Sequence, residues 1–134
     1  GRYKNPTICD ADNLRACATA LKNARITHDD FETCVADAQA KDLVYFDPPY
    51  VPLTATSDFT SYTAEGFSDP DQTRLRDVAL RLKNRGVTVL LSNSSAPRVR
   101  ELYANGFHIE EVSANRSINS VANRRGMITE LLMW

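Results

Sequence analysis

The chain has 134 residues and a mass of 15.0 kDa, with 43% hydrophobic and 25% charged residues. These values are ordinary for one soluble globular domain and exclude a collagen-like, disordered or membrane-spanning protein. Sixteen basic and seventeen acidic side chains give a net charge of -1, so any site for a polyanion must be local. The three cysteines lack CxxC spacing, which favours a reducing, cytoplasmic compartment over a disulfide framework or a zinc site.

The amino-terminal part of the chain has mainly helical signals. Apolar residues recur at helical spacing over residues 10–24 behind a capping aspartate, which predicts an amphipathic helix. Residues 24–27 are a candidate short strand. Asp30 can cap a helical turn that begins at Phe31.

A continuous apolar run over residues 43–46 ends at the sequence Asp47-Pro48-Pro49. This pattern is typical of a strand that is buried on both faces and stopped by prolines. Residues 51–68 are rich in Ser, Thr and aromatic residues without clear periodicity, which is typical of a long loop that is either functional or disordered.

The rest of the chain alternates helices and strands. The predicted elements are a helix that begins at Asp69 and Pro70 and ends before Gly86, a strand over 87–91, a helix over 97–104, and strands over 107–112 and 127–133. This order predicts an α/β fold with a parallel sheet. Ligands of such sheets bind at the carboxyl ends of the strands, so we expect Asp47, Ser92 and Asn93 at one edge.

The sequence Asp47-Pro48-Pro49-Tyr50 suits chemistry on an amine attached to an aromatic ring. Such an amine is a poor nucleophile because its lone pair is delocalised into the ring. The Asp47 carboxylate and the Pro48 carbonyl can accept its two hydrogens and stabilise developing positive charge. The prolines stiffen the turn, and the Tyr50 ring can stack on the base, which contributes roughly 1–3 kcal/mol. The alternative is a Pro-Pro turn with a packed tyrosine, but the position after an apolar strand favours a functional site.

The segment LVYFDPPY, followed by TSDFTSYTAEGF, a helix, VTVLLSN and a terminal ELLMW, resembles the carboxyl-terminal half of Dam-type DNA adenine methyltransferases. The initial GRYKNP resembles the end of that family's target-recognition segment. The resemblance implies a Rossmann-like methyltransferase sheet whose last strand is antiparallel, with residues 1–25 ending the target-recognition segment and residues 26–134 forming the catalytic core. It also implies S-adenosylmethionine as cofactor, flipping of adenine out of duplex DNA, methylation of its 6-amino group, and a bacterial or phage-type cytoplasmic enzyme.

The resemblance also assigns roles to individual residues. The implied catalytic residues are Asp47, Pro48, Pro49 and Tyr50, and the implied cofactor-binding residues are Asp30, Phe31 and Asp47. The implied DNA-binding residues are Arg2, Tyr3, Lys4, Phe59, Tyr62, Asn93, Arg116, Arg124 and Arg125. Asp30 could instead act only as a helix cap, and the basic and aromatic residues could be ordinary surface or packing residues. For Asn93 the resemblance gives a position on the sheet edge without a defined role.

No metal is expected, because the sequence His28-Asp29-Asp30 lacks the further ligands that a metal site needs. One departure from the family is serious. The five glycines are all about twenty or more residues apart, so the glycine-rich turn that wraps the methionine end of the cofactor is missing. We therefore expect a fragment of a longer enzyme, or a piece whose first strands come from another chain, or an inactive piece.

A sheet that lacks its first strands leaves an edge and an apolar face uncovered, which predicts pairing with the missing amino-terminal part, with a complementary chain or with a second copy. Two alternative functions stay open at this point. One is an inactive or partner-dependent binding module, and the other is an amine methyltransferase that acts on RNA, cytosine or protein.

Overall fold

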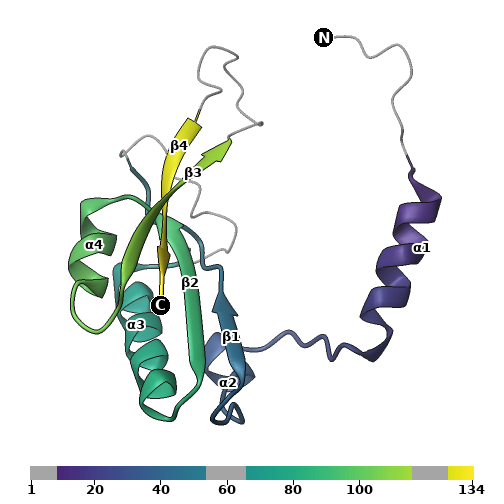
Figure 1. Ribbon diagram of the computed structural model, residues 1–134, viewed down its shortest axis with the longest axis horizontal. Helices are drawn as coiled ribbons and strands as arrows, with labels where there is room; N and C mark the ends of the chain where they lie inside the picture. The colour runs from purple at the N-terminus through teal and green to yellow at the C-terminus, as the bar shows by residue number, and fades with distance from the viewer. Residues whose placement is uncertain (1–8, 54–65, 116–126) are drawn as a thin grey trace.

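The computed structural model describes residues 9–53, 66–115 and 127–134, and its main feature is a four-stranded sheet (Figure 1). The strands are β1 (Leu43–Phe46), β2 (Thr88–Ser94), β3 (Ile109–Asn115) and β4 (Met127–Met133), in the order β1-β2-β4-β3. β1 and β2 are parallel, whereas β4 is antiparallel to both β2 and β3. The expected antiparallel last strand is therefore confirmed, and it lies inside the sheet.

Two helices follow the apolar patterns that predicted them. α3 (Asp69–Asn84) begins at the expected Asp69-Pro70. Its cap is Ser68: the Ser68 side chain accepts a hydrogen bond from the backbone of Asp71, whose carboxylate accepts one from the backbone of Ser68. Gly86 follows its end at a φ of 80°, a conformation that favours glycine. α4 is Pro97–Tyr103.

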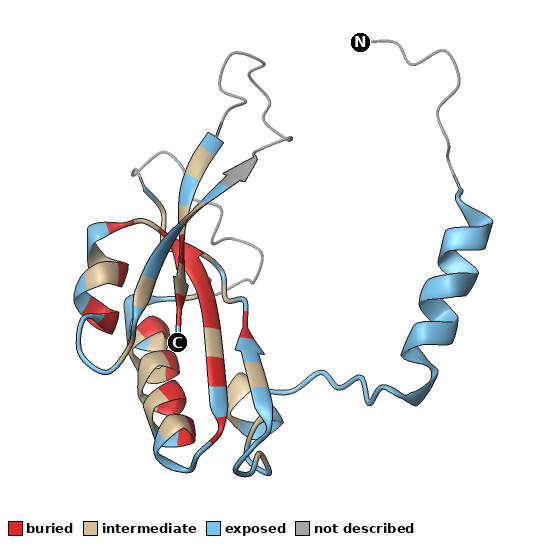
Figure 2. Ribbon diagram, in the orientation of Figure 1, coloured by how far each residue is buried: buried red, intermediate tan, exposed pale blue. Residues whose placement is uncertain are grey.

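The described amino-terminal elements are α1 (Ala11–Ala20), the 3-10 turn η1 (Leu21–Asn23) and α2 (Phe31–Cys34). No residue of α1 is buried, and in Figure 2 the whole helix is exposed and stands apart from the sheet. The candidate strand at 24–27 is wrong, because this segment pairs with no strand among residues 9–53, 66–115 and 127–134. No helix in the described ranges is both long and apolar enough to cross a membrane.

The hydrophobic core lies between the sheet and helices α3 and α4, which pack on the same side of it (Figure 1). Side chains alternate along β2, so Val89 and Leu91 point into this core. Its fully buried members from the helices and from β4 are Leu75, Val78, Ala79, Leu82, Val99, Tyr103, Leu131 and Met133. The core therefore fixes β2, the strand that runs beside Asp47.

Two predictions about the strands need correction. β1 is not buried on both faces: Phe46 is buried, but Leu43 is 66% and Tyr45 is 55% exposed, because β1 is an edge strand and the described helices cover one face of the sheet. β2 does not end at residue 91 but continues to Ser94, because its polar residues still pair with β4, with Asn93 opposite Leu131.

Candidate active site

The end of β1 and the polar part of β2 meet, as the sequence predicts. The register places Phe46 opposite Leu91, so the next residues, Asp47 and Ser92, are neighbours. The Ser92 hydroxyl donates a hydrogen bond to Asp47 Oδ1 at 2.7 Å. No lysine or arginine in the described part of the chain forms an ion pair with Asp47, which is exposed. The Asp47 carboxylate is thus held by a neutral donor and can accept further hydrogen bonds from a ligand.

Tyr50 is half-buried and is anchored at its hydroxyl end. The hydroxyl lies 3.5 Å from Glu130 Oε2 and donates toward it. Burial raises the pKa of Tyr50 to about 12, the carboxylates of Glu130 and Asp47 act in the same direction, and the nearby Ser92 hydroxyl opposes them. Tyr50 therefore stays neutral near pH 7, which suits a ring that stacks on a base.

Two buried amide side chains hold the backbone on both sides of Tyr50. Gln72 Nε2 donates to the Pro49 carbonyl at 2.9 Å, and the Val51 backbone amide donates to Asn93 Oδ1 at 3.0 Å. The two amides also bond to each other, Asn93 Nδ2 to Gln72 Oε1, at 3.2 Å. Gln72 is 2% and Asn93 0% exposed. A buried network of satisfied polar groups gives the turn a single rigid conformation.

An open pocket of about 280 Å³ lies beside the Asp47-Pro48-Pro49 turn. The rings of Phe31 and Phe67 meet edge to face across it, with 6.0 Å between their centroids. The residues that line it are Phe31, Tyr45, Phe46, Asp47, Pro48, Pro49, Phe67 and Leu75. An apolar, aromatic cavity with a carboxylate at its edge suits a flat heterocycle.

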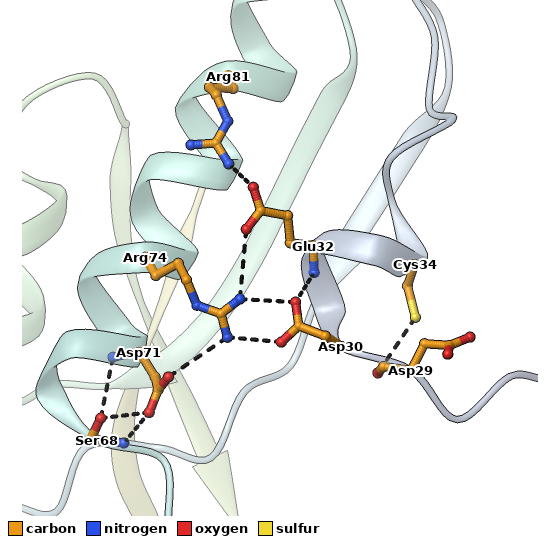
Figure 3. Close-up of polar contacts among 8 residues, drawn as sticks. All are labelled: Asp29, Asp30, Glu32, Cys34, Ser68, Asp71, Arg74 and Arg81. Carbon is orange, nitrogen blue, oxygen red and sulfur yellow. Dashed lines mark hydrogen bonds and ion pairs between the residues drawn. The ribbon is translucent and has the colours of Figure 1, made fainter.

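A cluster of charges joins α2 to α3 next to this pocket (Figure 3). Arg74 donates to both carboxylate oxygens of Asp30, at 2.9 and 2.8 Å, and its guanidinium lies 4.2 Å above the Phe31 ring. The hydrogen bonds from Arg74 hold the pKa of Asp30 below its usual value. Asp30 also caps α2 by accepting from the backbone of Glu32, which confirms its expected role as a cap.

The predicted cofactor residues therefore differ in their surroundings. Phe31 and Asp47 line the pocket, whereas Asp30 does not and is occupied by Arg74. A contact of Asp30 with cofactor stays a prediction.

Of the predicted DNA-binding residues, Asn93 lies within the described ranges. Asn93 is fully buried and its amide is bonded to Gln72, Val51 and the Ser94 backbone. A contact of Asn93 with DNA stays a prediction. The predicted residues that lie outside the described ranges are Arg2, Tyr3, Lys4, Phe59, Tyr62, Arg116, Arg124 and Arg125.

The structure adds Gln72, Phe67 and a specific contact of Ser92 to the site. Gln72 had a signal in the sequence, since it precedes Leu75 and Ala79 by three and seven residues and so shares the apolar face of α3. The contact of Ser92 depends on the strand register, which the sequence does not contain. Phe67 follows a loop without periodicity, so no pattern indicated that it would meet Phe31.

Comparison with known proteins shows the family of this chain. The family model for D12 class N6 adenine-specific DNA methyltransferases matches residues 1–118. The chain is 49% identical over 135 residues to the Type II methyltransferase M1.LlaDCHI of Lactococcus lactis subsp. cremoris, which covers 99% of this chain and 47% of that protein. It is 37% identical over 133 residues to a DNA adenine methylase of Vibrio cholerae, which covers 98% of this chain and 47% of that protein.

A third relative is the Type II methyltransferase M.MjaIII of Methanocaldococcus jannaschii, 46% identical over 126 residues, which are 93% of this chain and 43% of that protein. The chain spans about half the length of the curated relatives it matches. These matches confirm the resemblance carried by the DPPY segment. The chain belongs to the family of D12 class N6 adenine-specific DNA methyltransferases.

Proposed function

We propose that this chain is the catalytic part of an enzyme that methylates the 6-amino group of adenine in duplex DNA with S-adenosylmethionine. Membership of the D12 class supports the reaction, the cofactor and the substrate. The observation that carries the proposal is the Asp47 carboxylate, which is held by Ser92 and stands at the edge of an aromatic pocket without a cationic partner in the described ranges.

The proposed chemistry uses two acceptors and one stacking ring. The Asp47 carboxylate and the Pro48 carbonyl accept the two amine hydrogens, which favours the pyramidal nitrogen whose lone pair is free to attack. Tyr50 stacks on an adenine that has been flipped out of the duplex. When bound, S-adenosylmethionine would supply an electrophilic methyl group, with a neutral thioether as its leaving group. The methylated nitrogen is positively charged, so Asp47 stabilises it until it loses a proton to water.

The residues present fit one end of this cofactor. Phe31 and Phe67 would hold the adenine ring in the aromatic pocket. The glycine-rich turn for the methionine end is absent from the sequence. We therefore propose that a further part of the enzyme, on the same or a complementary chain, supplies the first strands of a Rossmann-like sheet. The span of about half of each relative supports this, and an inactive half that only binds a partner is the alternative.

The division of the chain and its DNA contacts belong to the same proposal. The exposed α1 supports a boundary near residue 25 between the end of a target-recognition segment and the catalytic core. The basic and aromatic residues that would meet duplex DNA are Arg2, Tyr3, Lys4, Phe59, Tyr62, Arg116, Arg124 and Arg125. A cytoplasmic location follows from a DNA substrate in bacteria or phages, and relatives from Vibrio cholerae and Escherichia phage P1 support it.

A chimera tests the proposal with the rest of an enzyme present. In it, this chain replaces the matching segment, 47% of the length, of the Lactococcus lactis methyltransferase. Incubation with labelled S-adenosylmethionine and duplex DNA, followed by digestion and mass spectrometry, should yield N6-methyladenine. Parallel reactions contain RNA, a duplex of only G·C pairs and protein, and preferential transfer to RNA, to cytosine or to protein would support the other amine methyltransferases. A folded chimera that binds DNA but transfers no methyl group would contradict the proposal.

A further inference from the structure

Three side chains form a chain of hydrogen bonds that ends at the Asp47 carboxylate. The Tyr45 hydroxyl donates to Ser92 Oγ at 2.9 Å, and Ser92 Oγ donates to Asp47 Oδ1 at 2.7 Å. A serine hydroxyl has one hydrogen, and because Ser92 accepts from Tyr45, that hydrogen is directed to Asp47. Oδ1 thereby accepts one hydrogen bond, whereas Oδ2 accepts none from the described residues and can accept from a substrate.

The backbone alone does not fix this carboxylate. The two prolines after Asp47 restrict backbone angles, but they leave its side-chain torsions free. Asp47 is exposed, so packing does not fix them either. Ser92, in contrast, is 6% exposed and lies in β2 between the fully buried Leu91 and Asn93. The buried Ser92 therefore has a fixed position beside the exposed Asp47 side chain. A charge-assisted hydrogen bond from Ser92 selects one orientation of the Asp47 carboxylate.

We propose that Ser92 is a positioning residue for methyl transfer, which aims Asp47 Oδ2 at the amine, and that Tyr45 sets the direction in which Ser92 donates. The inference rests on the proposed function, because it assigns Asp47 as the acceptor of the amine hydrogen. Ser92 is neither a nucleophile nor a substrate ligand in this role. Its contribution is to make the acceptor geometry correct before the substrate arrives.

The test uses steady-state methylation of duplex DNA by the chimera defined above. Ser92→Ala should lower kcat about 10- to 100-fold, as expected for loss of a hydrogen bond to a charged group, with little change in the KM for DNA or for the methyl donor. Ser92→Thr, which keeps a hydroxyl, should recover most of kcat. Tyr45→Phe should give a smaller loss, because Ser92 can still donate to Asp47 without it.

Two controls separate positioning from stability and from Tyr50. Ser94 lies on the same strand, is equally buried at 6%, and donates to the Val51 carbonyl at 2.6 Å instead of to Asp47. Ser94→Ala should therefore match Ser92→Ala in lost thermal stability but lose less of kcat. Because Ser92 also lies near the Tyr50 hydroxyl, Ser92→Ala is repeated in a Tyr50→Phe background, where the loss of kcat should persist.

The outcomes for the inference and for the proposed function are distinct. An unsubstituted chimera that methylates adenine, together with a Ser92→Ala variant of equal kcat, would overturn the positioning role and leave the proposed function intact. A loss of kcat that Ser92→Thr does not restore, or that Ser94→Ala reproduces in full, would also overturn it. If the unsubstituted chimera folds and binds DNA but does not methylate adenine, the proposed function fails and the positioning role fails with it.

Discussion

Arg74 has two roles next to the aromatic pocket. Its guanidinium stacks on Phe31 and forms a two-point pair with Asp30 (Figure 3). Because the folded protein lowers the pKa of Asp30, the pair stabilises the fold above the unfolded value of 3.8. This stabilisation is lost as the pH falls through the lower pKa of the folded state. Acid should therefore weaken the contact between α2 and α3 beside the pocket.

Arg74→Met should remove most of this acid-dependent stability. Its free energy of unfolding should lie below that of the native chain at pH 7, and the difference should shrink as the pH falls from about 4 toward 2. Urea unfolding followed by circular dichroism at several pH values measures this. Arg15→Met is the control, since the Arg15–Asp12 pair is fully solvent-exposed and should contribute little. A difference that stays constant down to pH 2 would rule out the Asp30 pair as its source.

Tyr50 should act through its ring more than through its hydroxyl. In the chimera, Tyr50→Phe keeps the ring and should retain most methylation. Tyr50→Ala removes the stacking surface, which is worth roughly 1–3 kcal/mol, and should lower kcat/KM about 10- to 100-fold. Fluorescence of 2-aminopurine at the target position reports whether the flipped base is still held. Equal activity of the alanine and phenylalanine variants would exclude stacking on Tyr50.

At the scale of elements, α3 and β2 support the turn after β1 through the Gln72–Asn93 pair. Gln72→Leu would remove the hydrogen-bond partner of the Pro49 carbonyl and that of Asn93 Nδ2, and Asn93 is fully buried. We expect a loss of about 1–3 kcal/mol in the free energy of unfolding. Urea denaturation measures it, with Gln39→Leu at an exposed position as the control. A loss no larger than that of the control would show that the pair does not support the turn.

The elements also show what the sequence can and cannot predict. The position of α3 was predictable because its apolar spacing, its first-turn Pro70 and Gly86 are all local signals. The polar end of β2 was not predictable. Ser92, Asn93 and Ser94 belong to the strand because they pair with β4, which is distant in sequence. The DPPY turn was recognisable from its own chemistry. The side chains that hold this turn belong to α3 and β2. They could not be identified from the sequence, because their position depends on the packing of α3 and on the register between β1 and β2.

At the scale of the whole molecule, the described helices α3 and α4 cover one face of the sheet, and the edge strand β1 has exposed apolar residues. Leu43 and Tyr45 of β1 are exposed, and so are Leu14 and Leu21 in the α1 region. These surfaces are consistent with the proposal that further strands belong beside β1. The burial of β1 was not predictable from its own residues, because burial depends on which elements cover a strand.

The isolated chain should bind S-adenosylmethionine weakly or not at all. Of the proposed cofactor site it contains the residues for the adenine ring but lacks the glycine-rich turn for the methionine end. The chimera should bind it with the affinity of the Lactococcus lactis enzyme. Isothermal titration calorimetry on the two proteins makes the comparison. Tight binding by the isolated chain would contradict the proposal that it contains only part of the cofactor site.

The most direct test of the account is methyl transfer by the Asp47→Ala chimera. Transfer to adenine should fall at least about 100-fold, because the nitrogen loses the carboxylate that stabilises its developing charge. Circular dichroism and DNA binding should stay close to those of the unsubstituted chimera, since Asp47 is exposed and has no part in the core. Full methylation by a folded Asp47→Ala chimera would contradict the central role of this carboxylate.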